Sequence, residues 1–452
     1  MKLWHALFLM MRLEPLVHGA GLSSHVNLFL GTQNGGNNFP GVARPFGMVK
    51  LGPDLLESGT DSYAGYLPTG DFSGFSMMHE QGTGGAPKYG TVAQLPLVGN
   101  ITDHPLASIT VGRSGADQAS VGYYRAQTAE GVVVELGASA HAGMYRYTFP
   151  TNETANVLID VSHVLPSFRG QGLSQGYKGG NLTIYADGHY EGYGIYDNWW
   201  NRTQPGETRR RRETSLGFSG FVVPRDANGF LSTNPLTDGG YWGDPYYEAS
   251  SWAYSWGSVH DMKQMIAMMG GSETVLDRLN IMFTEGASGS SGIIFDSTNE
   301  PMFNIPYLYN YIDRQDLSVS QSRYIAKTYY NAGVSGLPGN SDAGAMQTWL
   351  LWNMIGLYPI TGQTTFLIHS PWFDSLPIHL GGGKTLRITS TGGDGNGDSK
   401  IHVQRLRVNG RSWRKNWLTW EDIFAHGGTM EFELGESPSD WFTGELPPSP
   451  AS

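Results

Sequence analysis

The chain has 452 residues, of which 39 % are apolar and 15 % are charged, with a formal net charge of −11. This acidic balance argues against a nucleic-acid partner, because binding to phosphates requires a basic surface. Cysteine is absent, which excludes disulfides, thiolate metal ligands and a cysteine nucleophile. No run of 18 apolar residues occurs, so we expect no membrane-spanning helix.

The first residues and four short motifs bear on the compartment. In residues 1–20, the charged Lys2 is followed by the apolar run Leu3–Met11, which is typical of a signal peptide. Arg12 and Glu14 interrupt this pattern. Asn-X-Thr sequons, which also arise by chance, occur at Asn100, Asn152, Asn181 and Asn201. Together, the signal-like start and the sequons favour a secreted protein.

Residues 21–205 have the pattern of a β-sandwich. Short apolar runs such as 131–136 and 144–149 are separated by Gly, Pro and Asn turns. The Asp187-Gly188 pair between two such runs predicts a β-hairpin.

Helical periodicity dominates residues 214–361. It predicts four helices, at Val259–Met269, Ser272–Phe283, Ser320–Asn331 and Asp342–Leu357. Residues 362–440 return to strand patterns, with a hairpin signal at Asn409-Gly410. Residues 441–452 end in a proline-rich tail that we expect to be disordered.

One acidic loop resembles the start of a calcium-binding loop. The run Asp394–Asp398 alternates acidic or amide residues with glycine. However, Ser399 and Arg405 stand where such a loop needs Gly and Glu. The pattern therefore favours a polar hairpin loop.

Two carboxylates have a local context that suits catalysis. Glu248 lies among aromatic residues just before a helix, where desolvation would raise its pKa as a general acid requires. An equally good interpretation is that Glu248 is a surface residue beside aromatic residues of the core. Asp342 follows the stiff loop 336–341 and is either a helix N-cap or a functional group.

The segment Asn299-Glu300-Pro301 is a further polar cluster, and it can alternatively be interpreted as a helix start. Two carboxylates with aromatic surfaces are the minimum for glycoside hydrolysis.

Several segments, in order, resemble the glycoside hydrolases of family 92, which are exo-acting α-mannosidases. They are residues 26–32, 38–54, 74–85, 160–164, 246–261, 299–301, 336–349 and 378–434. The resemblance implies an N-terminal β-sandwich followed by an (α/α)6 barrel. It also implies removal of terminal α-linked mannose from glycans with inversion, assisted by bound Ca²⁺ near the substrate.

The resemblance also assigns roles to individual positions. It implies that Glu248 is the general acid and Asp342 the general base. Asn340 stands where many members carry a second acidic residue that assists the base. The other implied positions are Trp252, His260 and His79 for substrate binding or support of the acid, and Asn299 and Glu300 for the metal.

The expected fold class is therefore α+β, but the helical domain is short. Twelve barrel helices of about 12 residues need roughly 200 residues with their loops, whereas 214–361 predicts about four helices. We also find no Trp-Asp-Thr motif, which members use to contact the sugar. We therefore expect an incomplete barrel with little or no turnover, and solvent exposure of the apolar residues Leu350, Leu351, Trp352, Met354, Ile355 and Leu357.

Two other functions are compatible with the sequence. A non-catalytic carbohydrate-binding β-sandwich protein would also explain the many aromatic residues, but not why Glu248 and Asp342 fall in two matching motifs. A structural surface protein explains little beyond the sequons.

Overall fold

The structure is a computed structural model of the 452-residue chain. It describes residues 21–84, 87, 89–102, 107–170, 174–197, 210–212, 221–223, 225–230, 246, 249–287, 292–394, 397–442 and 445–452. The chain forms two compact units: unit 1 comprises Met1–Asn201 with Ala332–Ser335, and unit 2 comprises Arg202–Asn331 with Gly336–Ser452. The proposed signal peptide at residues 1–20 and the sequon at Asn201 lie outside the described residues.

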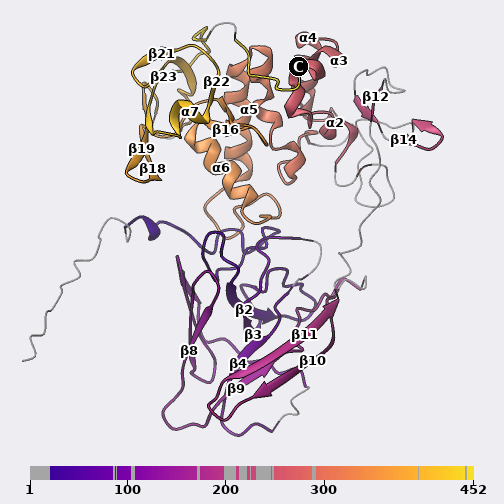
Figure 1. The fold of residues 1–452 in the computed structure, drawn as a ribbon, viewed down its shortest axis with the longest axis vertical. Coiled ribbons are helices and arrows are strands. Elements are labelled where there is room, and N and C mark those ends of the chain that lie inside the picture. Colours follow the sequence, from indigo (N-terminus) through magenta and orange to yellow (C-terminus); the bar gives the residue numbers. More distant parts are fainter. Residues whose placement is uncertain are drawn as a thin grey trace, which may run out of the picture. The chain divides into compact units, whose positions relative to one another are not determined.

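Unit 1 is built on two antiparallel sheets (Figure 1). One has the strand order β1-β2-β3-β4-β9 and the other β5-β6-β7-β8. The first comprises β1 (Val42–Ala43), β2 (Lys50–Leu56), β3 (Asp71–Ser76), β4 (Ala93–Val98) and β9 (Ala155–Asp160). The second comprises β5 (Gln118–Ser120), β6 (Tyr123–Gln127), β7 (Val133–Ala138) and β8 (Gly143–Thr148).

The two sheets share one hydrophobic core. Alternate residues of each strand point to the same face, and in β7 the buried ones are Val134 and Leu136. The core cluster joins side chains from both sheets, including Leu51, Phe72, Phe75 and Leu95 from one and Tyr124, Val134 and Leu136 from the other. The predicted β-sandwich is therefore confirmed.

The predicted Asp187-Gly188 hairpin is also confirmed. Strands β10 (Gly176–Ile184) and β11 (Tyr190–Asp197) form a two-stranded antiparallel ribbon. Tyr185 donates its backbone N–H to the carbonyl of His189, and Gly188 adopts a positive φ of 89° within the turn.

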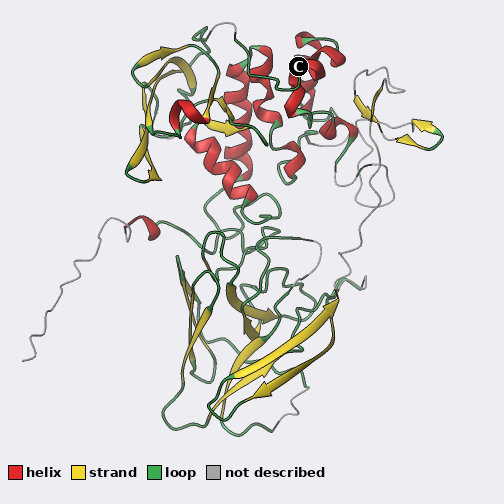
Figure 2. Cartoon of the chain, viewed as in Figure 1, coloured by secondary structure: helices red, strands yellow, loops and turns green. Residues whose placement is uncertain are grey.

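Unit 2 contains α-helices and short 3₁₀ segments (Figure 2). The α-helices are α2 (Ser251–Tyr254), α3 (Met262–Met269), α4 (Ser272–Met282), α5 (Gln315–Tyr329), α6 (Ala345–Ile355) and α7 (Trp420–Ile423). The 3₁₀ segments are η2 (Val259–Asp261), η3 (Glu300–Met302) and η4 (Ile305–Ile312). The four predicted helices correspond to α3, α4, α5 and α6, and α5 starts five residues earlier than predicted.

The C-terminal β-region of unit 2 contains a three-stranded and a five-stranded sheet. The first orders β16 (Leu357–Pro359), β17 (Thr365–Ile368) and β22 (Trp417–Thr419). The second orders β18 (Ser375–Gly381), β19 (Lys384–Thr391), β23 (Gly428–Gly435), β20 (His402–Val408) and β21 (Arg411–Trp413). Two short ribbons precede α2: β12 (Arg210–Arg212) with β13 (Phe221–Val223), and β14 (Arg225–Asp226) with β15 (Gly229–Phe230).

The expectation that the apolar face of α6 would be exposed is wrong for most of its residues. Ile355 and Leu357 are buried in the core of the C-terminal β-region, and Trp352 packs against that core. The ring of Trp352 lies 5.7 Å from that of Phe366. Only Leu351 among the six residues is strongly exposed, at 56 %. The C-terminal sheets thus cover most of the surface that an incomplete barrel was expected to leave exposed.

The end of the chain, which we expected to be disordered, has definite contacts in the structure. Trp441 is buried and donates its indole N–H to Gln315 Oε1 at 3.3 Å. The Ser449 hydroxyl accepts the backbone N–H of Lys263 at 2.9 Å. No helix in the described part of the chain is long and apolar enough to cross a membrane.

Candidate active site

The segment that contains Glu248 is anchored on both sides, although Glu248 itself lies outside the described residues. Tyr246 and Ser251 both donate their hydroxyls to the carbonyl of Val222, at 2.5 and 2.6 Å. Ser250 caps α2 by accepting the N–H of Ala253. The short helix α2 is therefore fixed to strand β13.

Trp252 lies in the interior of this region. Its side chain is fully buried and its ring lies 4.8 Å from that of Phe221. A ring without exposed surface offers no platform for a sugar, which favours a supporting role for Trp252, and this role stays a prediction. The resemblance had allowed either role.

Asn299 and Glu300 begin η3, and both side chains are largely protected from solvent. Asn299 is 6 % exposed and occupies the N-cap position. Oxygen Oε1 of Glu300 is buried. Burial, with an added contribution from the nearby Glu300 charge, raises the pKa of Tyr330 on the neighbouring segment. Two residues with oxygen-bearing side chains thus stand at one end of η3.

Asp342 lies in an unusual backbone segment before α6. Asp342, Ala343 and Gly344 all have positive φ, at 44°, 56° and 93°. Non-glycine residues rarely adopt this conformation, and such strain tends to occur at functional sites. The Asp342 side chain is exposed, and Gly344, not Asp342, is the N-cap of α6. The alternative that Asp342 serves as a helix N-cap is therefore not what the structure shows.

Ser341 holds the strained segment in place. Its hydroxyl accepts the N–H of Gly344 at 3.2 Å and donates to Gln347 Oε1 at 2.8 Å. Its side chain is fully buried. The sequence analysis did not identify Ser341 as a site residue. The one feature that could have indicated its role is its position directly before Asp342.

A close backbone approach brings the Asp342 loop beside the Asn299 segment. A Cβ added to Gly339 would lie 2.6 Å from Cβ of Thr298. Only glycine therefore fits at position 339 without a shift of one segment. Because Asn340 follows Gly339 and Asn299 follows Thr298, the structure places these two predicted site segments side by side.

Trp349 on α6 completes this arrangement. Its indole N–H donates to the carbonyl of Phe303 at 2.9 Å. Its ring lies 5.5 Å from that of Tyr330 and 6.1 Å from that of Tyr307. Asn304, next to Phe303, donates to the carbonyl of Trp256 at 3.2 Å. Helix α6, segments η3 and η4, and the end of α2 are therefore connected around the candidate site.

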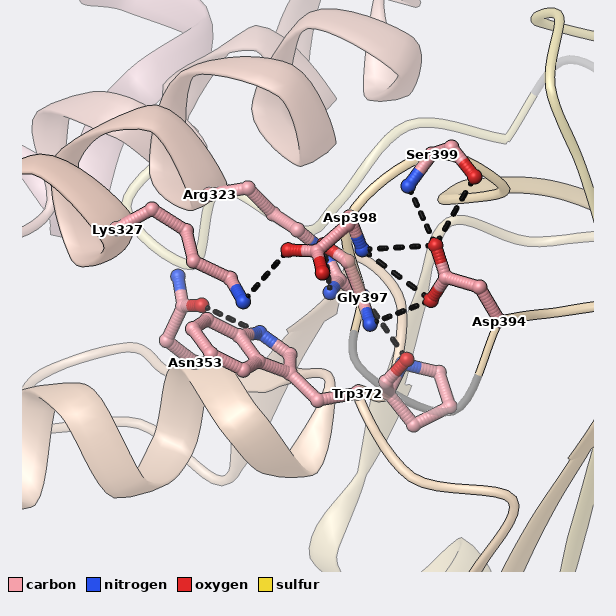
Figure 3. A network of polar contacts seen from close by, with 9 residues as sticks. Arg323, Lys327, Asn353, Trp372, Asp394, Gly397, Asp398 and Ser399 are labelled. Carbon is pink, nitrogen blue, oxygen red and sulfur yellow. Dashed lines mark hydrogen bonds and ion pairs between the residues drawn. The ribbon is translucent and has the colours of Figure 1, made fainter.

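A network of polar contacts connects helices α5 and α6 to the C-terminal β-region (Figure 3). Arg323 on α5 is 3 % exposed and donates to the carbonyls of Gly397, Ser370 and Pro371. Trp372 donates its indole N–H to Asn353 Oδ1 on α6 at 2.9 Å. The network thus fixes α6, which carries the Asp342 loop at its start.

The Asp394–Asp398 loop belongs to this network (Figure 3). The Asp394 carboxylate accepts the N–H groups of Gly397, Asp398 and Ser399. Asp398 Oδ1 lies 2.8 Å from Nζ of Lys327. Both carboxylates therefore have partners within the protein, as expected for a polar hairpin loop rather than a calcium loop.

Two further predicted site residues, His260 and His79, are described by their own contacts. His260 in η2 is exposed, and its carbonyl accepts the N–H of Ala451 at 3.1 Å near the end of the chain. His79 belongs to unit 1, where its side chain is fully buried. Its Nε2 lies 2.7 Å from Asp54 Oδ1 and its Nδ1 lies 2.8 Å from the carbonyl of Lys50. These contacts hold the His79 side chain inside unit 1, and its assignment to substrate binding stays a prediction.

Asp54 is shared by two histidines inside the sandwich. His163 Nε2 lies 3.3 Å from its second oxygen, Oδ2. Burial acts to raise the pKa of Asp54, but the charges and hydrogen bonds of His79 and His163 outweigh it and lower the pKa far below its ordinary value. Burial acts to lower the pKa of His163, yet Asp54 raises it above the ordinary 6.5. Sequence reasoning missed this cluster, although all three residues fall in the matching segments.

The metal site that the resemblance implies has two candidate ligands, Asn299 and Glu300. Asn299 and Glu300 offer oxygen donors, which suit a hard cation such as calcium and not zinc. Calcium takes about 6–8 oxygen ligands. In the described part of the chain, no three His, Asp or Glu side chains are grouped so that they could hold a metal. These residues do not form a complete calcium site by themselves.

Comparisons with known proteins cover most of the chain. Residues 25–210 match the glycosyl hydrolase family 92 N-terminal domain, and residues 186–436 match the family's catalytic domain. An uncharacterized secreted glycosidase of Arthroderma benhamiae is 32 % identical over 270 residues, which are 56 % of this chain and 33 % of that protein. The match therefore spans about a third of that relative's length.

Solved structures have the same fold. A family GH92 α-mannosidase from Bacteroides thetaiotaomicron in complex with mannoimidazole gives a TM-score of 0.74 at 17 % identity, with 93 % of this chain and 95 % of that chain covered. An inverting GH92 mannosidase of the same species gives 0.66 at 14 %, with 92 % and 97 % covered. At such low identities, the similarity to these structures shows the fold alone. Family membership rests on the match to the catalytic domain, which covers more than half of the sequence. The chain belongs to glycosyl hydrolase family 92.

Proposed function

We propose that this protein is a secreted exo-acting α-mannosidase that removes terminal α-linked mannose from glycans with inversion. The observation that carries the proposal is the match to the family's catalytic domain over residues 186–436. That range contains both Glu248 and Asp342. The mannoimidazole complex and the inverting enzyme among the similar structures support the choice of mannose and of stereochemistry.

In the proposed reaction Asp342 is the general base. Its exposed carboxylate takes a proton from a water molecule, and the water oxygen attacks the anomeric carbon of the terminal sugar. The bond from that carbon to the glycosidic oxygen breaks as Glu248 donates a proton to the leaving oxygen. For inversion we expect the two carboxyl groups to be about 6.5–9.5 Å apart, which leaves room for the water.

Neighbouring residues have supporting roles in this proposal. Asn340 directly precedes the buried Ser341 and lies beside the Asn299 segment, so it can contact the sugar next to the base. Buried Trp252 positions the segment that carries Glu248. If calcium is bound, the oxygen atoms of Asn299 and Glu300 would be among its ligands. No step of the mechanism is assigned to the ion.

The substitutions Asp342→Asn and Glu248→Gln test the catalytic roles. We expect each to lower hydrolysis of an α-mannoside about 10²–10⁴-fold, the usual contribution of general acid–base catalysis. Asp277→Asn is the matched control, because Asp277 is exposed on α4 and outside the site. If neither site variant changes turnover, the catalytic assignment is wrong. Mannoside binding without any turnover would favour the alternative, a carbohydrate-binding protein.

Removal of metal tests the calcium proposal. We expect excess chelator to lower the activity and added Ca²⁺, but not Zn²⁺, to restore it, because the donors are oxygens. Full activity in chelator would remove calcium from the proposal. The described helices of unit 2 fall short of twelve, so we expect a lower kcat/KM than in a complete barrel enzyme, mainly through a raised KM.

A further inference from the structure

Strands β10 and β11 form a hairpin of unit 1 (Figure 1). One face of this hairpin carries exposed side chains that the proposed catalytic function does not use. The register pairs Asn181 with Tyr193 and Gly179 with Ile195. Tyr193 is 62 % exposed and Ile195 is 57 % exposed. Asn181 is the acceptor position of one of the four sequons, and its side chain is exposed.

The opposite face of the hairpin is turned toward the sandwich. Tyr190 accepts a hydrogen bond from Gln94 Nε2 of β4 at 2.8 Å. Tyr196 donates its hydroxyl to the carbonyl of Val161, which follows β9. Because side chains alternate along a strand, Asn181, Tyr193 and Ile195 point to the other side, away from these contacts.

We propose that Asn181 carries an N-linked glycan whose first N-acetylglucosamine packs on Tyr193 and Ile195. Directly opposite residues in an antiparallel pair have Cβ atoms about 4.5–5.5 Å apart. A sugar attached to Nδ2 of Asn181 is therefore within reach of the Tyr193 ring. The apolar face of a sugar and an aromatic ring are complementary surfaces. This inference rests on the proposed secretion of the chain.

The sequon itself is accessible to the modifying enzyme. Thr183 is exposed, and its hydroxyl donates to Oδ1 of Asn181 at 3.4 Å. In the reaction, Nδ2 of Asn181 forms a bond to C1 of the reducing-end sugar of a lipid-linked oligosaccharide. The bond from C1 to the lipid pyrophosphate breaks, the lipid pyrophosphate leaves, and an amide proton passes to the transferase.

The other described sequons lack this arrangement. Asn100 and Asn152 are exposed but lie outside the strands, in a loop and in a turn. Neither has a cross-strand partner, so no strand register places a ring opposite them. Asn181 thus differs from them by the aromatic and aliphatic residues on its own face of the hairpin. A glycan there would also cover apolar surface that is otherwise exposed to water.

Secretory expression tests whether the site is occupied. The full chain is produced in yeast behind a heterologous signal sequence, so entry into the pathway does not depend on residues 1–20. Glycopeptide mass spectrometry of the purified protein should show the Asn181 peptide occupied, and Thr183→Ala should abolish this. An unoccupied Asn181 in the folded, secreted protein would overturn the proposal.

Thermal unfolding tests whether the first sugar packs on Tyr193. Endoglycosidase H leaves one N-acetylglucosamine on Asn181, whereas the variant Asn181→Gln, trimmed in the same way, carries none at this position. We expect the trimmed protein to unfold about 2–4 °C higher than Asn181→Gln, the shift that a modest aromatic contact gives in a domain of this size. In a Tyr193→Ala background the difference should disappear.

A matched control uses a residue on the other face of the same hairpin. Ile184 is 68 % exposed, and in an Ile184→Ala background the stabilisation by the first sugar should persist. An equal effect of the sugar with and without Tyr193 would refute the contact. Neither readout uses mannosidase activity, so a failure of the proposed enzymatic function, shown by Asp342→Asn, is distinguishable from a failure of this inference.

Discussion

Arg323 offers a direct test of the network that fixes α6 (Figure 3). Its guanidinium donates to three carbonyls and to the Ser370 hydroxyl, at 2.8–3.0 Å. The group also lies 5.2 Å from the ring of Trp372. Burial lowers the pKa of Arg323 to about 10, and the charges of Asp394 and Asp398 oppose this. The side chain is therefore still charged at neutral pH.

The substitution Arg323→Ala removes these donors and leaves buried carbonyls without partners. Such losses cost about 3–5 kcal/mol when a buried charged partner is removed. At about 2–4 °C per kcal/mol for a domain of this size, we expect the melting temperature of unit 2 to fall by roughly 6–20 °C. Arg323→Lys should recover little of it, because an ammonium cannot reproduce the planar fork of the guanidinium.

Differential scanning calorimetry measures the shift, and amide hydrogen exchange locates it. We expect faster exchange in α5 and in the loop that contains Gly397, because both are held by Arg323. Arg405→Ala is the matched control: its side chain is 65 % exposed and 3.4 Å from Glu433, so the loss should be below about 1 kcal/mol. Equal effects of Arg323→Ala and Arg405→Ala would refute the reasoning.

Two further predictions concern the loop and the pH dependence of stability. Gly339→Ala should lower activity and stability together, because the added Cβ would meet Thr298, whereas Gly137→Ala, which has open space, should change neither. Since Asp54 raises the pKa of His163, protonated His163 stabilises unit 1 fully below about pH 6.5, and the contribution is lost as pH rises through the higher pKa of the folded state. Burial lowers the pKa of His369 to about 3, so its contribution to unit 2 is present above about pH 6.5 and is lost as pH falls toward 3. Thermal melts between pH 3 and 9 check both, and unchanged profiles in His163→Asn and His369→Phe would contradict these assignments.

The parts of the fold that sequence could predict have strong periodicity or specific turn residues. The Asp187-Gly188 and Asn409-Gly410 hairpins follow from residues that accept positive φ. Helix α3 ends at Gly270, whose φ of 105° makes it a C-cap. These signals are local, so they are readable without knowledge of the tertiary contacts.

The start of α5 was missed because its buried face is largely polar. Gln315 and Ser318, which lie in the missed first turn, are buried. Buried polar side chains do not contribute to hydrophobic periodicity, so the pattern indicated a helix start only at Ser320. The exposure expected for α6 was wrong for a related reason: which sheet covers a helix depends on contacts between distant segments, such as Trp352 with Phe366.

The candidate site shows the same division. The sequence identified the segments around Asp342 and Asn299 through their resemblance to a family, but not the contacts that bring them together. The Gly339–Thr298 approach involves a residue without a side chain, and Ser341 acts through one hydroxyl. A histidine in a matching motif has the same letter whether it faces a sugar or a buried carboxylate, so the sequence could not show that His79 contacts Asp54.

The bracing of Asp342 bears on how a short helical domain would affect catalysis. The loop is held by Ser341, by the approach of Gly339 to Thr298 and by the Trp349–Phe303 hydrogen bond, all within unit 2. None of these contacts requires additional helices, so the position of the proposed base does not depend on a complete barrel. Missing barrel helices would instead remove surfaces that hold the rest of the sugar. We therefore expect their absence to appear mainly as weak mannoside binding, with a raised KM, while Asp342→Asn lowers kcat.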